Sequence, residues 1–350
     1  MRKYVLSIVS ICVFVFTTKA QEGFENILFA DLSDATKLTN GYVLPAAEGF
    51  IFGMSNGWYH TAKVHKPFGF DITIGANASF ADDNHKSIDI NALNLSTKIS
   101  KSPLTSPTLF GENAVINAFE VTIPANSDPN INGGIHPELK RNFTMPDGIG
   151  EDLFLNGVPT PAVQIGLGLP YKFEVSVRFV PEIGGDETSA KLFGLGLKKE
   201  ITNWFGVMDK TPLHISLMGA FTNMSVSNTI KDASITGISV TNGSATLELK
   251  SFTVQALASL NLPFINIYGG FGYINGTSSL NLDGTYNLNY QEAGQTYTKR
   301  LVDPLSLDHQ ANGFTTTAGL RLSLGFFKIF GSYSLQKYNT VNLGIAFSIR

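Results

Sequence analysis

The clearest catalytic pattern in the chain is Gly-x-Ser-x-Gly, in which Ser55 stands between Gly53 and Gly57. In hydrolases this pattern turns a strand into a helix and exposes a nucleophilic serine, with an acid and a histidine later in the chain. No helix pattern follows Ser55 in this sequence. We therefore interpret the match as accidental, and we expect no catalytic residues and no enzyme activity.

The histidines and the acidic pairs do not have the spacing of a metal site. His60 and His65 are five residues apart, a spacing that aligns two ligands on one face of neither a strand nor a helix. The pairs Asp82–Asp83 and Glu151–Asp152 do not fit a calcium-binding loop. We expect the histidines at solvated loop positions, and we predict neither a metal nor a cofactor.

The elements that must position any site are long alternating strands, of which Phe68–Phe80 (FGFDITIGANASF) is the clearest. Its even positions are apolar and its odd positions are small or polar, so a strand here has one apolar and one polar face. Extended, it reaches roughly 43 Å, enough to cross a bilayer at a tilt. The polar face carries Asp71, Thr73 and Asn77, which suit a water-facing lumen better than a dry core.

The clearest hairpin joins Val163–Leu169 to Phe173–Phe179 through a turn at Pro170–Tyr171. Both arms alternate between apolar and polar residues. Because an arginine on a lipid face costs about 2–4 kcal/mol near the middle of a membrane, the polar face must point into the barrel. The polar residues that we assign to the lumen from this hairpin and from a later strand are Gln164, Glu174, Ser176, Arg178 and Arg321.

The remaining chain repeats the alternation and has connections of two lengths. Further strands are expected at 87–95, 113–123, 190–199, 213–226, 246–260, 264–274, 314–324, 327–336 and 340–350. Short turns at 170–171, 261–263 and 325–326 contrast with long polar connections at 124–161, 227–245 and 275–312, an asymmetry typical of outer-membrane barrels. Residues 279–302 form either two more strands or an external hairpin. The sequence thus predicts an all-β, antiparallel transmembrane β-barrel of 14 strands, with 12 as the alternative.

Residues 1–20 have the pattern of a secretory signal peptide. Arg2 and Lys3 precede a short apolar stretch, and Thr18 and Ala20 occupy the positions before a cleavage site. Cleavage would leave 22 basic against 28 acidic residues, a formal charge of −6. This mild acidity argues against nucleic acid as a partner. The expected location is the bacterial outer membrane, with membrane lipid around the barrel.

Residues 21–62 are predicted to form an N-terminal plug or periplasmic segment ahead of the barrel at 63–350. Phe24–Leu38 fits a short amphipathic helix, and the glycines and the proline between Gly41 and Gly57 are expected to break regular structure after it.

Three aromatic residues of the predicted plug need burial, namely Phe50, Phe52 and Trp58. We expect them to bind a small hydrophobic ligand inside the barrel.

A soluble β-sandwich is the rival fold, because it also alternates. It predicts shorter strands, turns every 8–12 residues and no systematic difference between the connections at its two ends.

Several short motifs carry a family resemblance. They are Tyr42–Pro45, Asn56–Ala62, Gly69–Thr73, Pro161–Leu169, Val177–Pro181 and Gly194–Lys198. On these motifs the chain resembles an uncharacterised family of outer-membrane β-barrel proteins of Gram-negative bacteria. More distantly, its layout is similar to the long-chain fatty-acid and aromatic-hydrocarbon transporters. That resemblance implies fourteen strands and an N-terminal hatch.

Three hypotheses about function follow. The first is passive uptake of small hydrophobic solutes through a plugged barrel, in which case loss of the protein must lower uptake of such solutes. The second is a non-transporting surface protein whose loops 124–161 and 275–312 bind a partner, and it predicts a filled lumen. An outer-membrane hydrolase would need a serine, histidine and acid together at one rim of the barrel.

Overall fold

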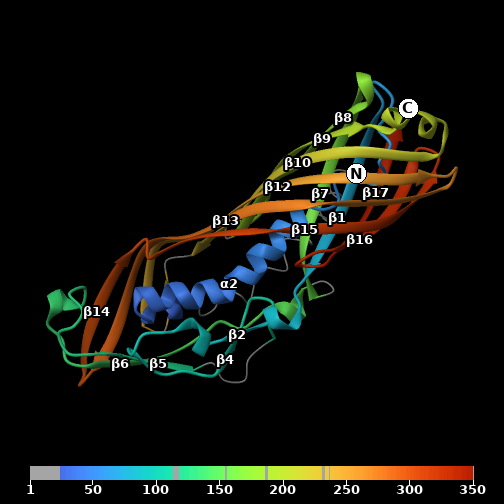
Figure 1. Cartoon of the computed structure of the whole chain (residues 1–350). Helices are drawn as coiled ribbons and strands as arrows, with labels where there is room; N and C mark the ends of the chain where they lie inside the picture. Colours follow the sequence, from blue (N-terminus) through green and yellow to red (C-terminus); the bar gives the residue numbers. More distant parts are fainter. Residues whose placement is uncertain are drawn as a thin grey trace.

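The computed structural model describes residues 24–112, 118–153, 156–185, 188–230, 233–235 and 237–349. The predicted signal peptide therefore lies outside the described residues. The molecule is elongated, with a closed ring of strands at one end and a broader part, here called the head, at the other (Figure 1). Three ring strands continue out of the ring to form one side of the head. No helix among these residues is long and apolar enough to span a membrane.

Ten antiparallel strands form the ring within the described part of the chain. They are β1 (Phe70–Phe80), β7 (Gly157–Leu169), β8 (Phe173–Gly184), β9 (Thr188–Glu200), β10 (Leu213–Ile230), β12 (Ile238–Asn261), β13 (Ile265–Glu292), β15 (Leu305–Leu324), β16 (Phe327–Leu335) and β17 (Thr340–Ile349). Each ring strand pairs with the ring strands before and after it in the chain, and β17 pairs with β1. The sheet is therefore a closed up-and-down barrel without a free edge in the ring, and the all-β antiparallel class is confirmed.

The predicted strand number is wrong, because two alternating segments belong to the head. Residues 87–95 contribute only β2 (Ser87–Asp89), which pairs with β4 (Thr105–Pro107). Of 113–123, the first five residues lie outside the described residues. The rest is β5 (Ala118–Ile123), which lies between β3 (Ile99–Lys101) and β6 (Leu139–Thr144). Alternation marks a strand with one buried face, whether its partner is the ring or a small sheet.

The segment 279–302 adds no strand to the ring. Its first part continues β13, which is 28 residues long, and its second part is β14 (Gln295–Val302), which folds back on the end of β13. The short strand β11 (Ala233–Ile235) pairs with β12 in the same region. These extensions, seen at the lower left of Figure 1, form one wall of the head.

The N-terminal segment is more helical than the sequence predicts. A 3-10 turn, η1 (Phe24–Phe29), precedes α2 (Leu32–Met54), and Asp31 caps α2 by accepting a hydrogen bond from the Leu32 N–H at 3.1 Å. The helix runs through Gly41, Pro45, Gly49 and Gly53 without ending. Further 3-10 turns are η2 (Asp83–His85), η3 (Asn91–Leu93), η4 (Asn132–Gly134), η5 (Gly150–Asp152), η7 (Pro170–Lys172) and η8 (Thr202–Lys210).

Close packing explains why glycines that normally weaken a helix are used inside α2. A Cβ atom on Gly49 would lie 2.9 Å from the ring of Phe110, and one on Gly53 would lie 2.7 Å from Thr160 Oγ1. The glycines allow the helix to approach its surroundings. Tertiary packing of this kind outweighs the roughly 1 kcal/mol by which glycine disfavours a helix.

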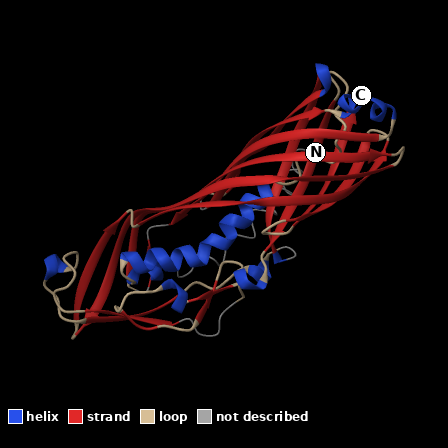
Figure 2. Cartoon of the chain, viewed as in Figure 1, coloured by secondary structure: helices blue, strands red, loops and turns tan. Residues whose placement is uncertain are grey.

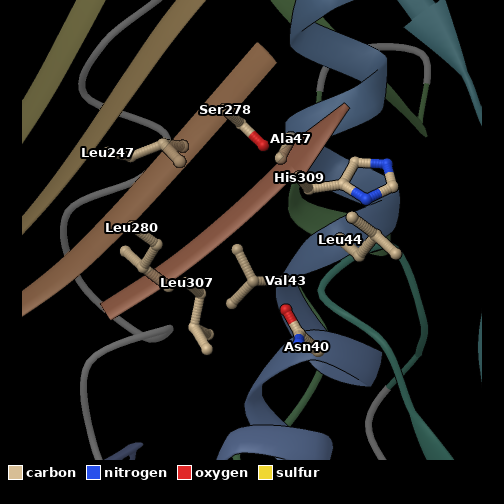
Figure 3. Close-up of a pocket in the computed structure, with 9 residues that line it drawn as sticks. All are labelled: Asn40, Val43, Leu44, Ala47, Leu247, Ser278, Leu280, Leu307 and His309. Carbon is tan, nitrogen blue, oxygen red and sulfur yellow. The ribbon is translucent and has the colours of Figure 1, made fainter. Parts of the chain in front are cut away.

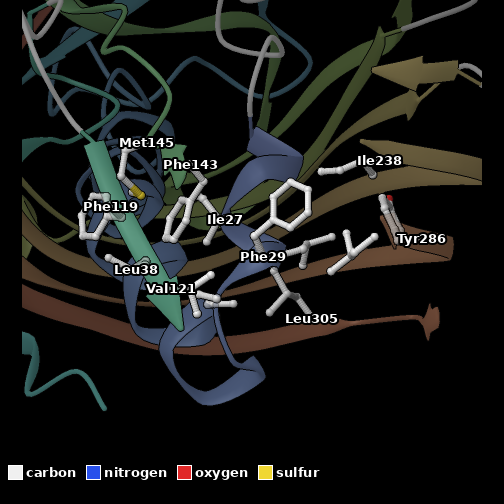
Figure 4. Packing of buried hydrophobic residues seen from close by; sticks show 14 of the residues in the cluster. Ile27, Phe29, Leu38, Phe119, Val121, Phe143, Met145, Ile238, Tyr286 and Leu305 are labelled. Atoms are coloured by element: carbon white, nitrogen blue, oxygen red, sulfur yellow. The ribbon is translucent and has the colours of Figure 1, made fainter. Parts of the chain in front are cut away.

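The head is built in three layers, with α2 between the extended ring strands and the small sheets of 87–144 (Figures 1 and 2). Its core joins residues from all three layers, as Figure 4 shows. Leu38 of α2, Phe119 of β5 and Tyr286 of β13 are all buried in this one cluster. The N-terminal helix is therefore a structural part of the head.

The strands that run from ring to head change polarity along their length. Near the short turn at 325–326, the outward face of β15 is apolar and exposed, as at Leu320 and Leu322. In the same part, the inward face carries the buried polar residues Thr315, Thr317 and Arg321. The ring has the polarity of a soluble protein turned inside out.

From Phe314 toward the N-terminal end of β15, which lies in the head, the strand reverses this pattern. Its outward face becomes polar at Gln310 and Asn312, and its inward face becomes apolar at Leu305 and Leu307. The outward apolar face covers 252–260 on β12, 265–273 on β13 and 314–324 on β15, which is nine to eleven residues of each strand. Thr316 is the polar residue within these faces. The head therefore has a polar exterior and an apolar core.

Candidate functional site

The candidate site is the interior of the ring, which the chain itself occupies. After α2 ends at Met54, residues 55–65 run through the lumen, and each of the ten strands contributes an inward residue that contacts this segment. These residues are Asp71, Gln164, Arg178, Lys198, Ser216, Ser251, Asn266, Arg321, Ser334 and Asn342. We call 55–65 the lumen segment.

The end of the lumen segment nearest the head completes the C-terminus of α2. The last four carbonyl groups of the helix, at 51–54, would otherwise lack partners. Ser55 Oγ donates to the first at 2.7 Å. Asn56 supplies the next two with its side-chain Nδ2 and its backbone N–H, at 2.7 and 3.1 Å. Arg178 Nη1 donates to the last at 3.0 Å. The helix therefore ends fully capped inside the ring.

This arrangement gives Ser55 a structural position. A helix precedes Ser55 and extended chain follows it, the reverse of the order that a nucleophile turn requires. The buried hydroxyl contacts the carbonyl of Ile51 and the hydroxyl of Ser251. The Gly-x-Ser-x-Gly pattern here is a helix C-terminus.

Arg178 is fully buried and is held by neutral acceptors and an aromatic ring. Its guanidinium donates to the carbonyl oxygens of Met54 and Asn56, both at 3.0 Å, and to Gln164 Oε1 at 3.2 Å. It also lies 4.0 Å from the centre of the Trp58 ring. The negative end of the α2 dipole and the face of the indole both stabilise a cation at this position.

Trp58 fits against β9 because that strand has glycine at two inward positions. A Cβ atom on Gly194 would lie 2.9 Å from the indole ring, and one on Gly196 would lie 3.0 Å from it. Any larger residue at either position would displace the ring. The two glycines thus make room for the lumen segment.

The end of the lumen segment nearest the short turns is held by carboxylates from the ring strands. Asp71 Oδ2 lies 3.0 Å from His60 Nε2, and Glu174 Oε2 lies 2.8 Å from His65 Nδ1. A third carboxylate, that of Glu200, accepts the backbone N–H of Val64 at 3.1 Å.

Two basic side chains of the ring lie beside these contacts, one paired with an acid and one with a histidine. Lys198 Nζ lies 2.8 Å from the second oxygen of Glu174. Arg321 Nη1 donates to His60 Nδ1 at 2.9 Å, so the hydrogen on this neutral imidazole is assigned to Nε2, where it faces Asp71. The predicted solvated position of His60 is wrong, because this side chain is buried and bridges an acid and a base.

The structure places every residue that the sequence assigned to the lumen at a buried position on the inward face of the ring. They are Asp71, Thr73, Asn77, Gln164, Glu174, Ser176, Arg178 and Arg321. All of them except Thr73 and Ser176 make a hydrogen bond or ion pair with the lumen segment or with one another. Within the described part of the chain, the hydroxyl of Thr73 has no hydrogen-bond partner.

The three aromatic residues expected to bind a ligand are not brought together. Phe50 and Phe52 belong to one buried cluster, at the junction of ring and head, and Phe52 packs against Tyr338 with ring centres 5.9 Å apart. Trp58 belongs to a separate cluster inside the ring with Tyr59 and other residues.

A small apolar cavity lies between α2 and strands β12, β13 and β15 (Figure 3). Val43, Leu44, Ala47, Leu247, Leu280 and Leu307 line it, together with Asn40, Ser278 and His309. Its volume of about 20 Å³ is enough for a water molecule and far below that of an organic solute. Among the residues that the structure describes, no cluster of three or more histidine, cysteine or acidic side chains could hold a metal ion.

Glu48 ties α2 to the rim of the ring. Its carboxylate lies 2.7 Å from Lys337 Nζ, in the β16–β17 turn, and 2.8 Å from His309 Nε2 on β15. Burial opposes ionisation of Glu48, but the hydrogen bonds from Lys337 and His309 outweigh it and hold the pKa of this carboxyl below its ordinary value.

The family model that matches this chain is the Family of unknown function (DUF6588), and it covers residues 1–349. The chain therefore belongs to this family, and the resemblance to an uncharacterised family is confirmed. No curated protein matches the sequence.

Solved structures of outer-membrane barrels show a weak likeness. Ail of Yersinia pestis, in complex with the heparin analogue sucrose octasulfate, is 16% identical over 54% of this chain and 97% of its own, with a TM-score of 0.26. The translocator domain of the autotransporter NalP from Neisseria meningitidis is 10% identical over 81% and 89%, with a TM-score of 0.28. The CymD monoaromatic hydrocarbon channel is 9% identical over 81% and 88%, with a TM-score of 0.16. Because these TM-scores are low, the barrel is assigned from the strand pairings of this chain and not from the likeness.

Replacing Arg178 by methionine should destabilise the folded ring by about 2–5 kcal/mol, because the buried carbonyls of Met54 and Asn56 lose their charged donor. The measurement is the free energy of unfolding in detergent. Lys191→Met, at an exposed position of β9, is the control and should change stability by less than about 0.5 kcal/mol. Equal stability of Arg178→Met and the native protein would contradict this role.

The Glu48 contact should make stability depend on pH. A carboxyl whose pKa is lower in the folded state contributes stability above its unfolded pKa, near 4.5, and loses it as pH falls through the folded value. The difference in unfolding free energy between the native protein and Glu48→Gln should therefore shrink as pH falls from 7 to below 4. The control is Glu138→Gln in the exposed pair Glu138–Lys140, which should change the free energy of unfolding at pH 7 by less than about 0.5 kcal/mol.

Proposed function

We propose that this chain is an outer-membrane protein whose barrel spans the membrane, is sealed by its own lumen segment, and carries the head on the cell surface to bind a partner. The observation that carries the proposal is the reversal of polarity along β12, β13 and β15. An outward apolar face is stable only where the surroundings are apolar.

The length of the apolar face matches a membrane. A transmembrane strand needs about 9–11 residues, and the outward apolar faces of β12, β13 and β15 have nine to eleven. The same strands then continue for another nine to nineteen residues with a polar exterior, which suits water.

Exposed aromatic residues lie at both ends of this face, as in the girdles of outer-membrane barrels. At the short-turn end they include Tyr171, Trp204, Phe264 and Phe326, which are 65–85% exposed. At the end toward the head they include Phe179, Phe252, Tyr273 and Phe314.

Orientation follows from the lengths of the connections. In barrels of this class the short turns face the periplasm and the long connections face outward. The head is formed from the long connections and the extended strands, so it belongs on the external side. Export by a signal peptide at residues 1–20 fits this placement.

The filled lumen favours a surface-binding role over a channel. The lumen segment contacts all ten strands and uses hydrogen bonds along its whole length, which is the state expected of a non-transporting barrel. The head, with its own core, is the part that is free to meet a partner.

Passive uptake of small hydrophobic solutes is a second candidate. The apolar cavity beside α2 favours it, since leucine and valine side chains of the head line this cavity. For a solute to enter, α2 would have to move away from β13 and β15. A solute would then have to pass a ring interior lined by polar side chains, which suits a hydrophobic molecule poorly.

The membrane placement is tested by introducing one charge at two positions of the same strand. Leu320→Arg, near the middle of the apolar face of β15, should lower the stability of the barrel in lipid by about 2–4 kcal/mol. Gln310→Arg, on the same outward face but in the head, should be nearly neutral. The measurement is unfolding by denaturant in lipid vesicles. Equal effects of the two changes would contradict a membrane around the ring.

A further inference from the structure

The path of the chain through the ring separates α2 from β1. The helix starts in the head, where Leu38 and Tyr42 are part of the core, and ends in the mouth of the ring at Met54. Strand β1 starts at the opposite end, where the N–H of Phe68 donates to the carbonyl of Gly168 beside the β7–β8 turn. The chain must therefore traverse the whole lumen between the two.

The helix is fixed in the head by polar contacts with the long connection between β1 and β7. Ser96 donates from its N–H and its hydroxyl to the carboxylate of Asp34, at 2.9 and 2.6 Å. Tyr42 donates to the carbonyl of Asp147 at 2.7 Å. Together with the shared core, these contacts make 24–54 inseparable from the external part of the protein.

We infer that residues 24–54 lie outside the outer membrane and that the chain crosses it inside its own barrel before the first strand begins. This inference rests on the proposed orientation of the head. The N-terminal part of the chain is thus an external arm, and the lumen segment is a thread that joins it to the periplasmic end of β1.

The path of the chain through the ring keeps the lumen closed. A segment that is held by the head on one side and continues into β1 on the other cannot leave by moving sideways. The lumen can open only if α2 unpacks from the head and 24–54 is drawn through the ring. Ordinary gating by displacement of a free loop is excluded by this connection.

Site-directed labelling tests the path, with Cys12, the only cysteine of the chain, replaced by serine. Three exposed positions report on three places: Ser33 on the arm, Glu292 at the tip of β13, and Lys66 at the short-turn end. With a membrane-impermeant maleimide, Ser33→Cys and Glu292→Cys should react in intact cells as fully as in permeabilised cells. Lys66→Cys should react only after the outer membrane is permeabilised.

The possible outcomes separate this inference from the proposed function. Labelling of Glu292→Cys without Ser33→Cys in intact cells would overturn the external arm and leave the placement of the head intact. Labelling of Lys66→Cys alone in intact cells would overturn both.

A second measurement tests the thread directly. The hydroxyl groups of Ser55 and Ser251 are neighbours, so Ser55→Cys with Ser251→Cys should form a disulfide between the lumen segment and β12 in the membrane-embedded protein. Ser33→Cys with Ser251→Cys is the control. It should form none, because Ser33 lies about 33 Å from Ser55 along the helix. Failure of the first pair to cross-link in the folded protein would overturn the inference.

Discussion

The structure depends on one constraint: a closed ring with polar inward side chains must give those side chains partners. In the proposed membrane placement, lipid outside the ring takes the place of the hydrophobic core that would hold a soluble barrel, so stability comes from the strand ladders and from the lumen. The lumen segment meets this need. It provides backbone carbonyls and N–H groups and polar side chains such as those of Asn56 and His60. Residues from nine of the ten ring strands bind to this segment, and Asn342 of β17 lies beside Gly57.

Arg178 shows most clearly how ring and thread depend on each other. A fully buried guanidinium without these acceptors would be strongly unfavourable, and the carbonyl of Met54 without the guanidinium would lose its charged donor. Each therefore needs the other in place. The same holds at the short-turn end, where Glu174 binds both a histidine of the lumen segment and a lysine of a ring strand. The ring and the end of the N-terminal helix therefore stabilise each other.

The local pattern of the ring could be predicted from sequence, because alternation in single strands reveals which face is polar. The inward placement of Asp71, Gln164 and Arg178 follows from parity alone. The strand number could not be predicted, since 87–95 and 118–123 alternate equally well in the small sheets of the head. The full length of the helix could not be predicted, because Gly49 and Gly53 serve close packing against residues more than 25 positions away, which no local rule detects. The partners of His60 and His65 were missed for the same reason.

The roles of the ring and of the lumen segment both require a lumen that is filled in the native state. The conductance of the purified native protein in planar lipid bilayers tests this most directly. A barrel threaded and bonded as described should insert and remain electrically silent across the physiological range of voltage. A stable, open ion conductance of the native protein would show that the lumen segment does not seal the ring.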